Sequence, residues 1–345
     1  MTAARSRILA LAVVASVTIT ATVAFIVLGP GRDAPSARSA AEVADAPAVG
    51  PTPAGPPATE VLASSHLVFR STALDQTYGQ VAVVSLDDLG GPRVGLPLSC
   101  DRVFATHGSG ICLTSDRGVA TTYDVQLLGP GLEPVARLPV AGIPSRARVS
   151  SDGRWAATTT FVTGHSYTSA NFSTATEIFN MAEGTSLGNL ETFSFERGGK
   201  PYSAVDINVW GVTFAPDGTR FYTTVATGGG AFLAEGDSRA RTITISDVSV
   251  ECPALSPDAS RIAYKKRVNQ TTWRIHVRDL ASGADVALAE TRSVDDQLEW
   301  WDDQHVVYGL QREGSAETDV WTVPADGSGN PELLIEHAWS PAVVR

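Results

Sequence analysis

Hydrophobic and polar positions alternate along most of the chain after residue 65, and short turns rich in Asp and Gly interrupt the alternation. One unit recurs: an apolar strand, a turn of the Pro/Ser-Asp-Gly type, and a second apolar strand. It is found at residues 149–157, 214–222, 255–264 and, with a variant turn, 300–308. This turn chemistry between alternating strands is typical of a β-hairpin. Each of the four segments is therefore predicted to be a hairpin.

A further alternating strand, ended by another turn, accompanies these hairpins. It occupies residues 81–90, 123–129, 177–184, 273–280 and 319–327. A hairpin, this strand and a short final strand make four antiparallel strands, which is one blade of a β-propeller.

Six blades are predicted from the spacing of the innermost strands. Their equivalent positions are Cys100, Arg146, Gly211, Cys252, Gln297 and Ser340, and the steps between them are 46, 65, 41, 45 and 43 residues. One strand remains after Ser340, and the stretch before Cys100 has room for three, beginning near His66, Val81 and Arg93. We therefore predict an all-β, six-bladed β-propeller over residues 65–345, closed by pairing of the C-terminal strand with the first three.

The turns at residues 215–218 and 256–259, each followed by Arg and an apolar strand, resemble the WD40-like repeats of the TolB propeller family. The resemblance extends over residues 66–345 and implies a propeller, but no single function, because such repeats also stand beside hydrolase domains. The chain departs from the family pattern before the propeller. TolB carries an α/β domain there, whereas this sequence has an apolar segment and a proline-rich stretch.

The apolar segment runs from Ile8 to Leu28 without a charged residue. Its 21 residues are long enough to cross a bilayer core of ~30 Å, whereas a cleaved signal peptide has an apolar run of about 7–15 residues. Arg5 and Arg7 favour a cytoplasmic amino end. We predict a cytoplasmic tail (1–7), an N-terminal transmembrane helix acting as a signal anchor (8–28), and a propeller on the extracytoplasmic side of the cell membrane. Cleavage within residues 36–46 is the alternative.

Residues 29–64 are dense in Ala, Pro and Gly and are predicted to be a disordered linker. The net charge of −11 argues against a nucleic-acid partner, because phosphate binding needs clustered Lys and Arg. The chain has no His-Glu-x-x-His, phosphate-loop or Cys-x-x-Cys motif, and its histidines show no ligand spacing. No cofactor or metal is predicted, and a monomer is expected.

Candidate binding residues come from an argument about faces. In a four-stranded blade the first and third turns lie on one face, and the second turn and the interblade connection on the other. The 65-residue step exceeds the others by about 20 residues, which fall in a second turn (163–172) and a connection (188–208). Long ordered loops on a rigid scaffold commonly carry binding. The candidates on that face are Tyr202, Asp206, Asn208, Trp210, Glu251, Lys265, Arg267, Asp295 and Asp296.

Two functions are compatible with these residues. The first is a binding or scaffold protein that engages a protein or cell-envelope ligand through the third-blade loops and the channel mouth. The second is an extracytoplasmic hydrolase or lyase that uses rim carboxylates such as Asp206 and Asp296. Two carboxylates about 5–10 Å apart in a deep pocket would favour glycoside chemistry, and a rim with an aromatic patch would favour a partner surface. A solvated rim of weak ion pairs is the non-functional alternative. The Asp and Gly of the opposite face are expected to form turns only.

Cys100 and Cys112 fall on adjacent strands of one hairpin and are candidates for a disulfide in an oxidising compartment. Cys252 repeats the position of Cys100 three blades away. It is expected to remain a small buried thiol.

Overall fold

A computed structural model describes residues 56–169 and 171–345. The predicted cytoplasmic tail (1–7), membrane span (8–28) and most of the linker (29–64) lie outside the described residues. None of the helices in the described part of the chain is long and apolar enough to cross a membrane.

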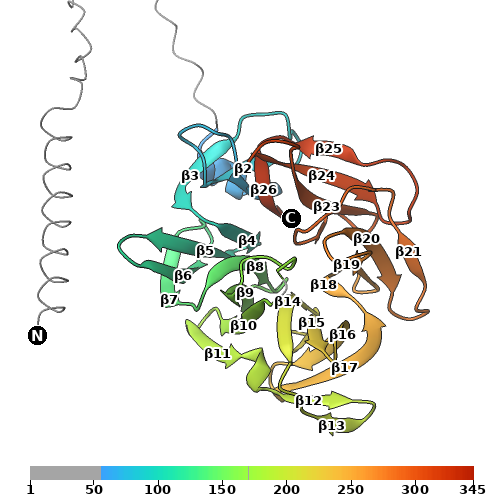
Figure 1. The fold of residues 1–345 in the computed structure, drawn as a ribbon. Helices are drawn as coiled ribbons and strands as arrows, with labels where there is room; N and C mark the ends of the chain where they lie inside the picture. Colours follow the sequence, from blue (N-terminus) through green and yellow to red (C-terminus); the bar gives the residue numbers. More distant parts are fainter. Residues whose placement is uncertain (1–55, 170) are drawn as a thin grey trace, which may run out of the picture. The chain divides into compact units, whose positions relative to one another are not determined.

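Six sheets stand around a central channel like the blades of a propeller (Figure 1). Numbered from the N-terminus, blade 1 consists of β26 (Ala338–Val344), β1 (His66–Ser71), β2 (Gln80–Ser85) and β3 (Val94–Ser99). Blade 2 consists of β4 (Arg102–Thr106), β5 (Ser109–Arg117), β6 (Thr121–Leu128) and β7 (Pro134–Pro139). Blade 3 consists of β8 (Ile143–Val149), β9 (Trp155–Thr163), β10 (Ser173–Asn180) and β11 (Thr185–Asn189).

Blade 4 contains β14 (Asn208–Phe214), β15 (Arg220–Thr227), β16 (Gly230–Asp237) and β17 (Thr242–Ser249), with β12 (Ser194–Arg197) and β13 (Lys200–Tyr202) added outside β17. Blade 5 consists of β18 (Glu251–Leu255), β19 (Arg261–Arg267), β20 (Trp273–Asp279) and β21 (Asp285–Ala287). Blade 6 consists of β22 (Glu299–Trp300), β23 (His305–Gln311), β24 (Thr318–Pro324) and β25 (Glu332–Ile335). The predicted six-bladed propeller is confirmed.

The ring closes where the sequence predicts. The C-terminal strand β26 pairs antiparallel with β1, and Val344 stands opposite His66. The channel is lined by the innermost strand of each blade: β26, β4, β8, β14, β18 and β22. The innermost strand of blade 1 is thus the last strand of the chain. Closure removes the exposed edges that an open sheet would leave.

The insertion between blades 3 and 4 was expected to be a long loop, but it also contains regular structure. Residues 190–192 form a short 3-10 helix, and β12 and β13 then form a hairpin whose first strand pairs in parallel with β17. The hairpin lies at the outer margin of the ring, beyond β17 (Figure 1). Phe195 is buried there, so the insertion covers the edge of blade 4 with a hydrophobic contact.

The ordered unit also begins earlier than the predicted boundary at residue 65. A single helical turn, α2 (Ala58–Leu62), lies within the predicted linker and buries Val61 in the core around β2 and β3. One apolar residue on so short a helix gives no periodic signal in the sequence.

Equivalent positions of the repeat share backbone geometry. Gly211, Cys252 and Ser340 all have positive φ near the start of their innermost strands, and the ladder is bulged at all three. In the first turns, Gly153, Gly218 and Ala259 occupy the left-handed region, which Gly adopts without the steric conflict that a Cβ introduces.

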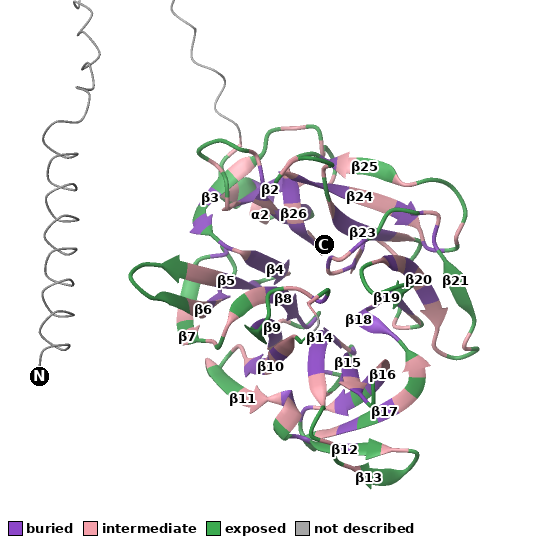
Figure 2. Ribbon diagram, in the orientation of Figure 1, coloured by how far each residue is buried: buried purple, intermediate pink, exposed green. Residues whose placement is uncertain are grey.

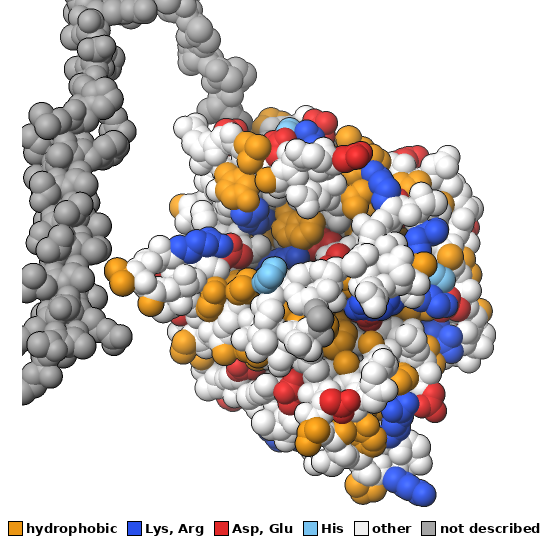
Figure 3. Space-filling model, in the orientation of Figure 1, with side chains coloured by type: hydrophobic (Ala, Val, Ile, Leu, Met, Phe, Trp, Pro, Cys, Tyr) orange, Lys and Arg blue, Asp and Glu red, His pale blue; other side chains and the backbone are white. Residues whose placement is uncertain are grey.

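Burial follows the radius of the ring. The innermost strands and the faces between blades are buried, whereas outer strands such as β7 and β21 are exposed (Figure 2). Neighbouring blades are also joined by indole hydrogen bonds. Trp155 Nε1–H donates to the carbonyl of Gly218 at 2.9 Å, and Trp300 Nε1–H donates to that of Ala254 at 2.9 Å. In space filling, hydrophobic, basic and acidic side chains fill the centre of the ring (Figure 3).

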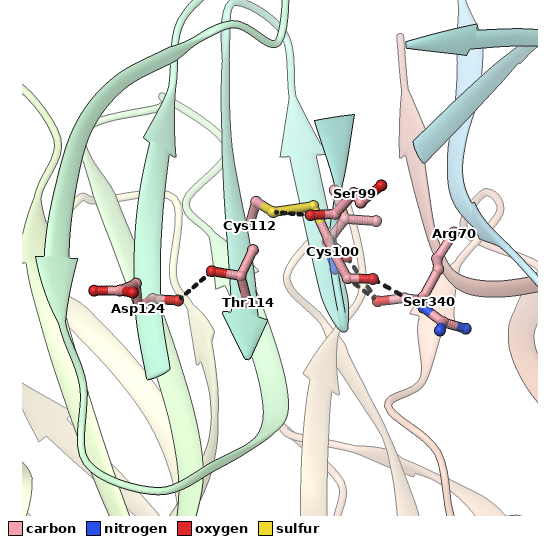
Figure 4. Close-up of a disulfide and its surroundings, with 8 residues drawn as sticks. Arg70, Ser99, Cys100, Cys112, Thr114, Asp124 and Ser340 are labelled. Carbon is pink, nitrogen blue, oxygen red and sulfur yellow. Dashed lines mark hydrogen bonds between the residues drawn. A yellow bond between two sulfur atoms is a disulfide. The ribbon is translucent and has the colours of Figure 1, made fainter. Parts of the chain in front are cut away.

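The structure joins Cys100 and Cys112 in a disulfide (Figure 4). Cys100 lies two residues before β4, and Cys112 lies on β5 opposite Val103, so the adjacent strands bring the two Cα atoms to 5.5 Å. The bond lies beside the ring closure, where Arg70 of β1 donates to the carbonyl of Cys100. Cys252 is a free, buried thiol, as expected.

Candidate functional site at the mouth of the channel

An open pocket of about 960 Å³ lies where blades 3, 4 and 5 meet, on the face to which the second turns belong. The described residues of the loop between β9 and β10 (164–169 and 171–172, called the 164–172 loop) form one wall, the connection 205–208 and the β15–β16 turn form another, and Ser249, Glu251, Arg267 and Gln270 form the third. Of the predicted site residues it collects Asp206, Asn208, Trp210, Glu251 and Arg267. Tyr202, Lys265, Asp295 and Asp296 do not line it.

The 164–172 loop folds inward over the channel. Its Tyr167 is only 3% exposed and packs edge-to-face against Phe161 and Phe172, with centroids 4.8 and 5.3 Å away. The Tyr167 hydroxyl is 3.0 Å from that of Ser145 on β8, and burial raises its pKa, so the phenol stays neutral. The ring of Tyr167 therefore closes much of the channel at this end and forms the aromatic floor of the pocket.

Trp210 was expected at an exposed rim, but it is 2% exposed. Its ring packs against Tyr167 and Phe172, with centroid distances of 5.7 and 5.3 Å. The inward fold of the 164–172 loop is what buries it. Trp210 lines the floor of the pocket through this aromatic cluster and is not a free surface anchor.

Lys265, Asp295 and Asp296 were expected at the mouth of the channel, but they lie inside it. Asp296 is fully buried and accepts from Arg102 of β4 at 2.6 Å. Asp295 accepts from the fully buried Lys265 and lies 3.4 Å from Arg146 of β8. Burial acts to raise the pKa of Asp295, but the charges of Lys265 and Arg146 outweigh it, and the pKa is lowered. These pairs hold together strands of different blades.

Further links cross the full width of the ring, from blade 3 to blade 6. The side-chain amide of Gln297 pairs with both backbone groups of Ala147, at 3.0 and 2.6 Å, and Arg148 forms an ion pair with Glu299. Because β22 has only two residues, the stretch before it is free to leave the blade and fill the channel. This plug explains why the pocket ends at Tyr167 and does not continue through the molecule.

Glu251 and Arg267 form the wall contributed by blade 5. The guanidinium donates to both carboxylate oxygens, at 2.8 and 3.2 Å, and lies over the ring of Trp273, 4.6 Å from its centroid. Glu251 is buried, whereas the Arg267 side chain is 34% exposed. Arg267 is therefore the cationic group that this wall presents to the pocket.

Asp206 and Asn208 organise the opposite wall. Asp206 accepts from the backbone N–H of Gly228 at 2.7 Å and from Thr227 at 2.9 Å, and these hydrogen bonds lower its pKa. Thr227 in turn is 2.7 Å from the hydroxyl of Tyr202, which lies at the end of β13. Asn208 accepts from the N–H and hydroxyl of Thr174 at the start of β10. These residues position the loops around the pocket.

The carboxylates of the pocket are poorly suited to acid–base catalysis. A general acid needs a raised pKa, whereas hydrogen bonds lower that of Asp206 and Arg267 neutralises Glu251. The carboxyl groups whose pKa is raised by burial, Glu191 and Glu299, do not line the pocket. In the described part of the chain, no three His, Cys, Asp or Glu side chains converge to hold a metal ion. The geometry instead matches an aromatic-floored binding surface.

The opposite face carries turn formers. Asp217 accepts from the backbone N–H groups of Thr219 and Arg220, both at 2.9 Å, and these bonds lower its pKa despite some burial. Asp152 and Asp258 have the same role in their blades. Sequence reasoning missed Tyr167, Phe172, Arg102 and Arg146. The position of Tyr167 within the long second turn was a signal for it, whereas the two arginines lie on inner strands that resemble ordinary β-structure.

Comparison with known proteins shows which solved structures share this fold. The sequence matches no protein-family profile and no curated protein. TolB from Acinetobacter baumannii aligns with 81% of this chain and 66% of its own, at 16% identity and a TM-score of 0.53. The fold is that of a TolB-like propeller. A chain of a nidogen/laminin complex aligns with 81% of this chain and 98% of its own, at 10% identity and a TM-score of 0.52. At these identities the likeness concerns the fold alone.

Proposed function

We propose that this chain is a membrane-anchored binding propeller that engages a protein or cell-envelope ligand through the pocket between blades 3, 4 and 5. The observation that carries the proposal is the pocket itself, whose aromatic floor and three loop walls are built by three successive blades. Its two carboxylates are already engaged by protein groups, which favours recognition over acid–base chemistry.

The proposed location is the extracytoplasmic side of the cell membrane, with the uncharged segment 8–28 as a single-pass anchor. The Cys100–Cys112 disulfide supports export, because such bonds persist in oxidising compartments. The proposed protein is a monomer, and the net charge of −11 argues against a nucleic-acid partner. Carbonate extraction tests the anchor: the protein should stay in the membrane pellet, and a soluble, shortened product beginning near residues 37–48 would contradict it.

A matched pair of substitutions tests the pocket. Ser249 is exposed and lines it, whereas Ser151 is exposed on the opposite face. The full chain should capture a partner from the envelope fraction of its source organism, and Ser249→Trp should abolish the capture by filling the pocket. Ser151→Trp should leave the capture unchanged. Equal capture by both variants would reject this surface as the binding site.

A further inference from the structure

The aromatic cluster at and beneath the floor of the pocket contains hydrogen-bond donors without acceptors among the described residues. The indole N–H groups of Trp210 and Trp273 are both buried, and neither has a hydrogen-bond partner among the described residues. Both indoles belong to the aromatic cluster around Tyr167. Buried donors are almost always satisfied by protein, water or a ligand, because an unpaired one carries a desolvation penalty. These two donors indicate that an acceptor belongs beside the cluster.

The same region carries unbalanced positive charge. Three cationic side chains face only two carboxylates: Arg102, Arg146 and Lys265 pair with Asp295 and Asp296. The two other ion pairs of the region, Glu251–Arg267 and Arg148–Glu299, each contain one positive and one negative charge. Tyr167 does not compensate, because burial raises its pKa and keeps the phenol neutral. The buried centre therefore holds one positive charge in excess, although the whole chain has a net charge of −11. A buried charge excess favours a counter-ion.

The excess charge reaches the pocket through the aromatic floor. Lys265 Nζ lies 4.8 Å from the ring centroid of Tyr167 and 4.9 Å from that of Trp273. Arg267 contacts the Trp273 ring from the pocket side and keeps a third of its side chain exposed. An anionic group in the pocket would thus meet a guanidinium directly, with Lys265 one aromatic ring further in.

We propose that the pocket binds a carboxylate of the ligand at its floor, between Arg267 and the indole of Trp210, with an adjoining apolar group against Phe172. This inference rests on the proposed function and specifies the ligand chemistry of the same site. A carboxylate fits because it accepts several hydrogen bonds while bringing one negative charge. Asp206 is exposed at the outer margin of the pocket and carries the same sign. It therefore disfavours a carboxylate at the margin and leaves the floor as the complementary position.

Benzoate and benzamide form a matched pair of probes, because they share a ring and differ in the charged group. The full chain labelled with 5-fluorotryptophan and titrated by ¹⁹F NMR reports binding, and Trp210→Phe assigns the Trp210 resonance. Benzoate should bind about tenfold more tightly than benzamide or better, as expected for hydrogen bonds to a charged acceptor, and should shift the Trp210 resonance. Trp210→Phe should remove most of that preference. Trp155→Phe is the control, because the Trp155 indole donates to Gly218 on the opposite face.

Equal affinity for the two probes, or a Trp210 resonance that benzoate leaves unmoved, would overturn the carboxylate site. Tighter binding of inorganic phosphate than of benzoate would overturn the choice of a carboxylate. N-acetylphenylalanine, N-acetylaspartate amide and glucuronate then distinguish a peptide C-terminus, an acidic side chain and a sugar acid as its source.

The two proposals fail separately. If Ser249→Trp abolishes partner capture while benzoate and benzamide bind equally, the carboxylate site is wrong and the proposed function stands. If capture is insensitive to Ser249→Trp while benzoate binds at Trp210, the proposed function is wrong and the carboxylate site stands.

Discussion

Substitution of Asp296 by Asn probes the plug that closes the channel. Asp296 is fully buried, and its two carboxylate oxygens accept from Arg102 at 2.6 Å and from the backbone N–H of Gly309 at 3.1 Å. Asn has the same shape but only one acceptor oxygen. Its amide NH2 group must therefore face one of the two donors, and Arg102 loses its counter-charge inside the ring.

Removing one partner of a buried ion pair costs about 3–5 kcal/mol, because the remaining charge is buried without compensation. We expect Asp296→Asn to lower the free energy of unfolding by about that amount. Asp124→Asn is the matched control. Asp124 pairs with Arg137 at 2.7 Å, but the Arg137 side chain is 56% exposed, and such pairs contribute about 0–1 kcal/mol.

Urea unfolding followed by tryptophan fluorescence measures both variants. A double variant, Arg102→Met with Asp296→Leu, should lose much less stability than Asp296→Asn, because replacing a buried pair by apolar groups is often neutral. If Asp296→Asn were as mild as Asp124→Asn, the channel would be solvated and the description of a plug would be wrong.

Three further predictions concern the turns and the cysteines. Ala259 has a φ of 57°, so Ala259→Gly should raise the free energy of unfolding by about 0.5–1 kcal/mol, and an unchanged urea midpoint would contradict the strain. Hydrogen bonds from Ser256 and Ser260 lower the pKa of Asp258 to about 2; the stability that its carboxylate contributes is therefore present above about pH 4 and is lost as the pH falls through 2. The urea midpoint of Asp258→Asn should accordingly lie below that of the wild type at neutral pH and converge with it near pH 2, and a constant difference would refute the assignment. Peptide mapping without reduction should recover Cys100 linked to Cys112 and Cys252 as a free thiol, and a bond to Cys252 would contradict the fold.

The fold was predictable because a propeller repeats local chemistry. Each hairpin can be recognised in the sequence by the residues of its own turn, as at Asp217 and Asp258. Six similar units can close a ring in few ways. The disulfide followed from the same local pairing of β4 and β5. The β12–β13 hairpin could not be predicted in this way. Its parallel pairing with β17 joins segments about 48 residues apart and produces no periodic pattern in the sequence.

The candidate site was predictable only in its position. The length of the connections marked the correct face, and Asp206, Asn208, Trp210, Glu251 and Arg267 do meet in one pocket. Exposure could not be predicted, because it depends on the 164–172 loop folding inward and on ion pairs between residues far apart in the sequence. Arg102 and Asp296 are separated by 194 positions, and no local pattern in either segment indicates the other.

Photo-cross-linking from the two faces tests the central claim, that the pocket between blades 3, 4 and 5 binds the partner. Benzoylphenylalanine is placed at Gln270 and, in a separate variant, at Ser151; both positions are exposed, but they lie on opposite faces of the ring. Illumination of cells producing the full chain should give a partner adduct from position 270 and none from position 151. An adduct from position 151 with none from position 270 would place the binding surface on the opposite face and contradict the account.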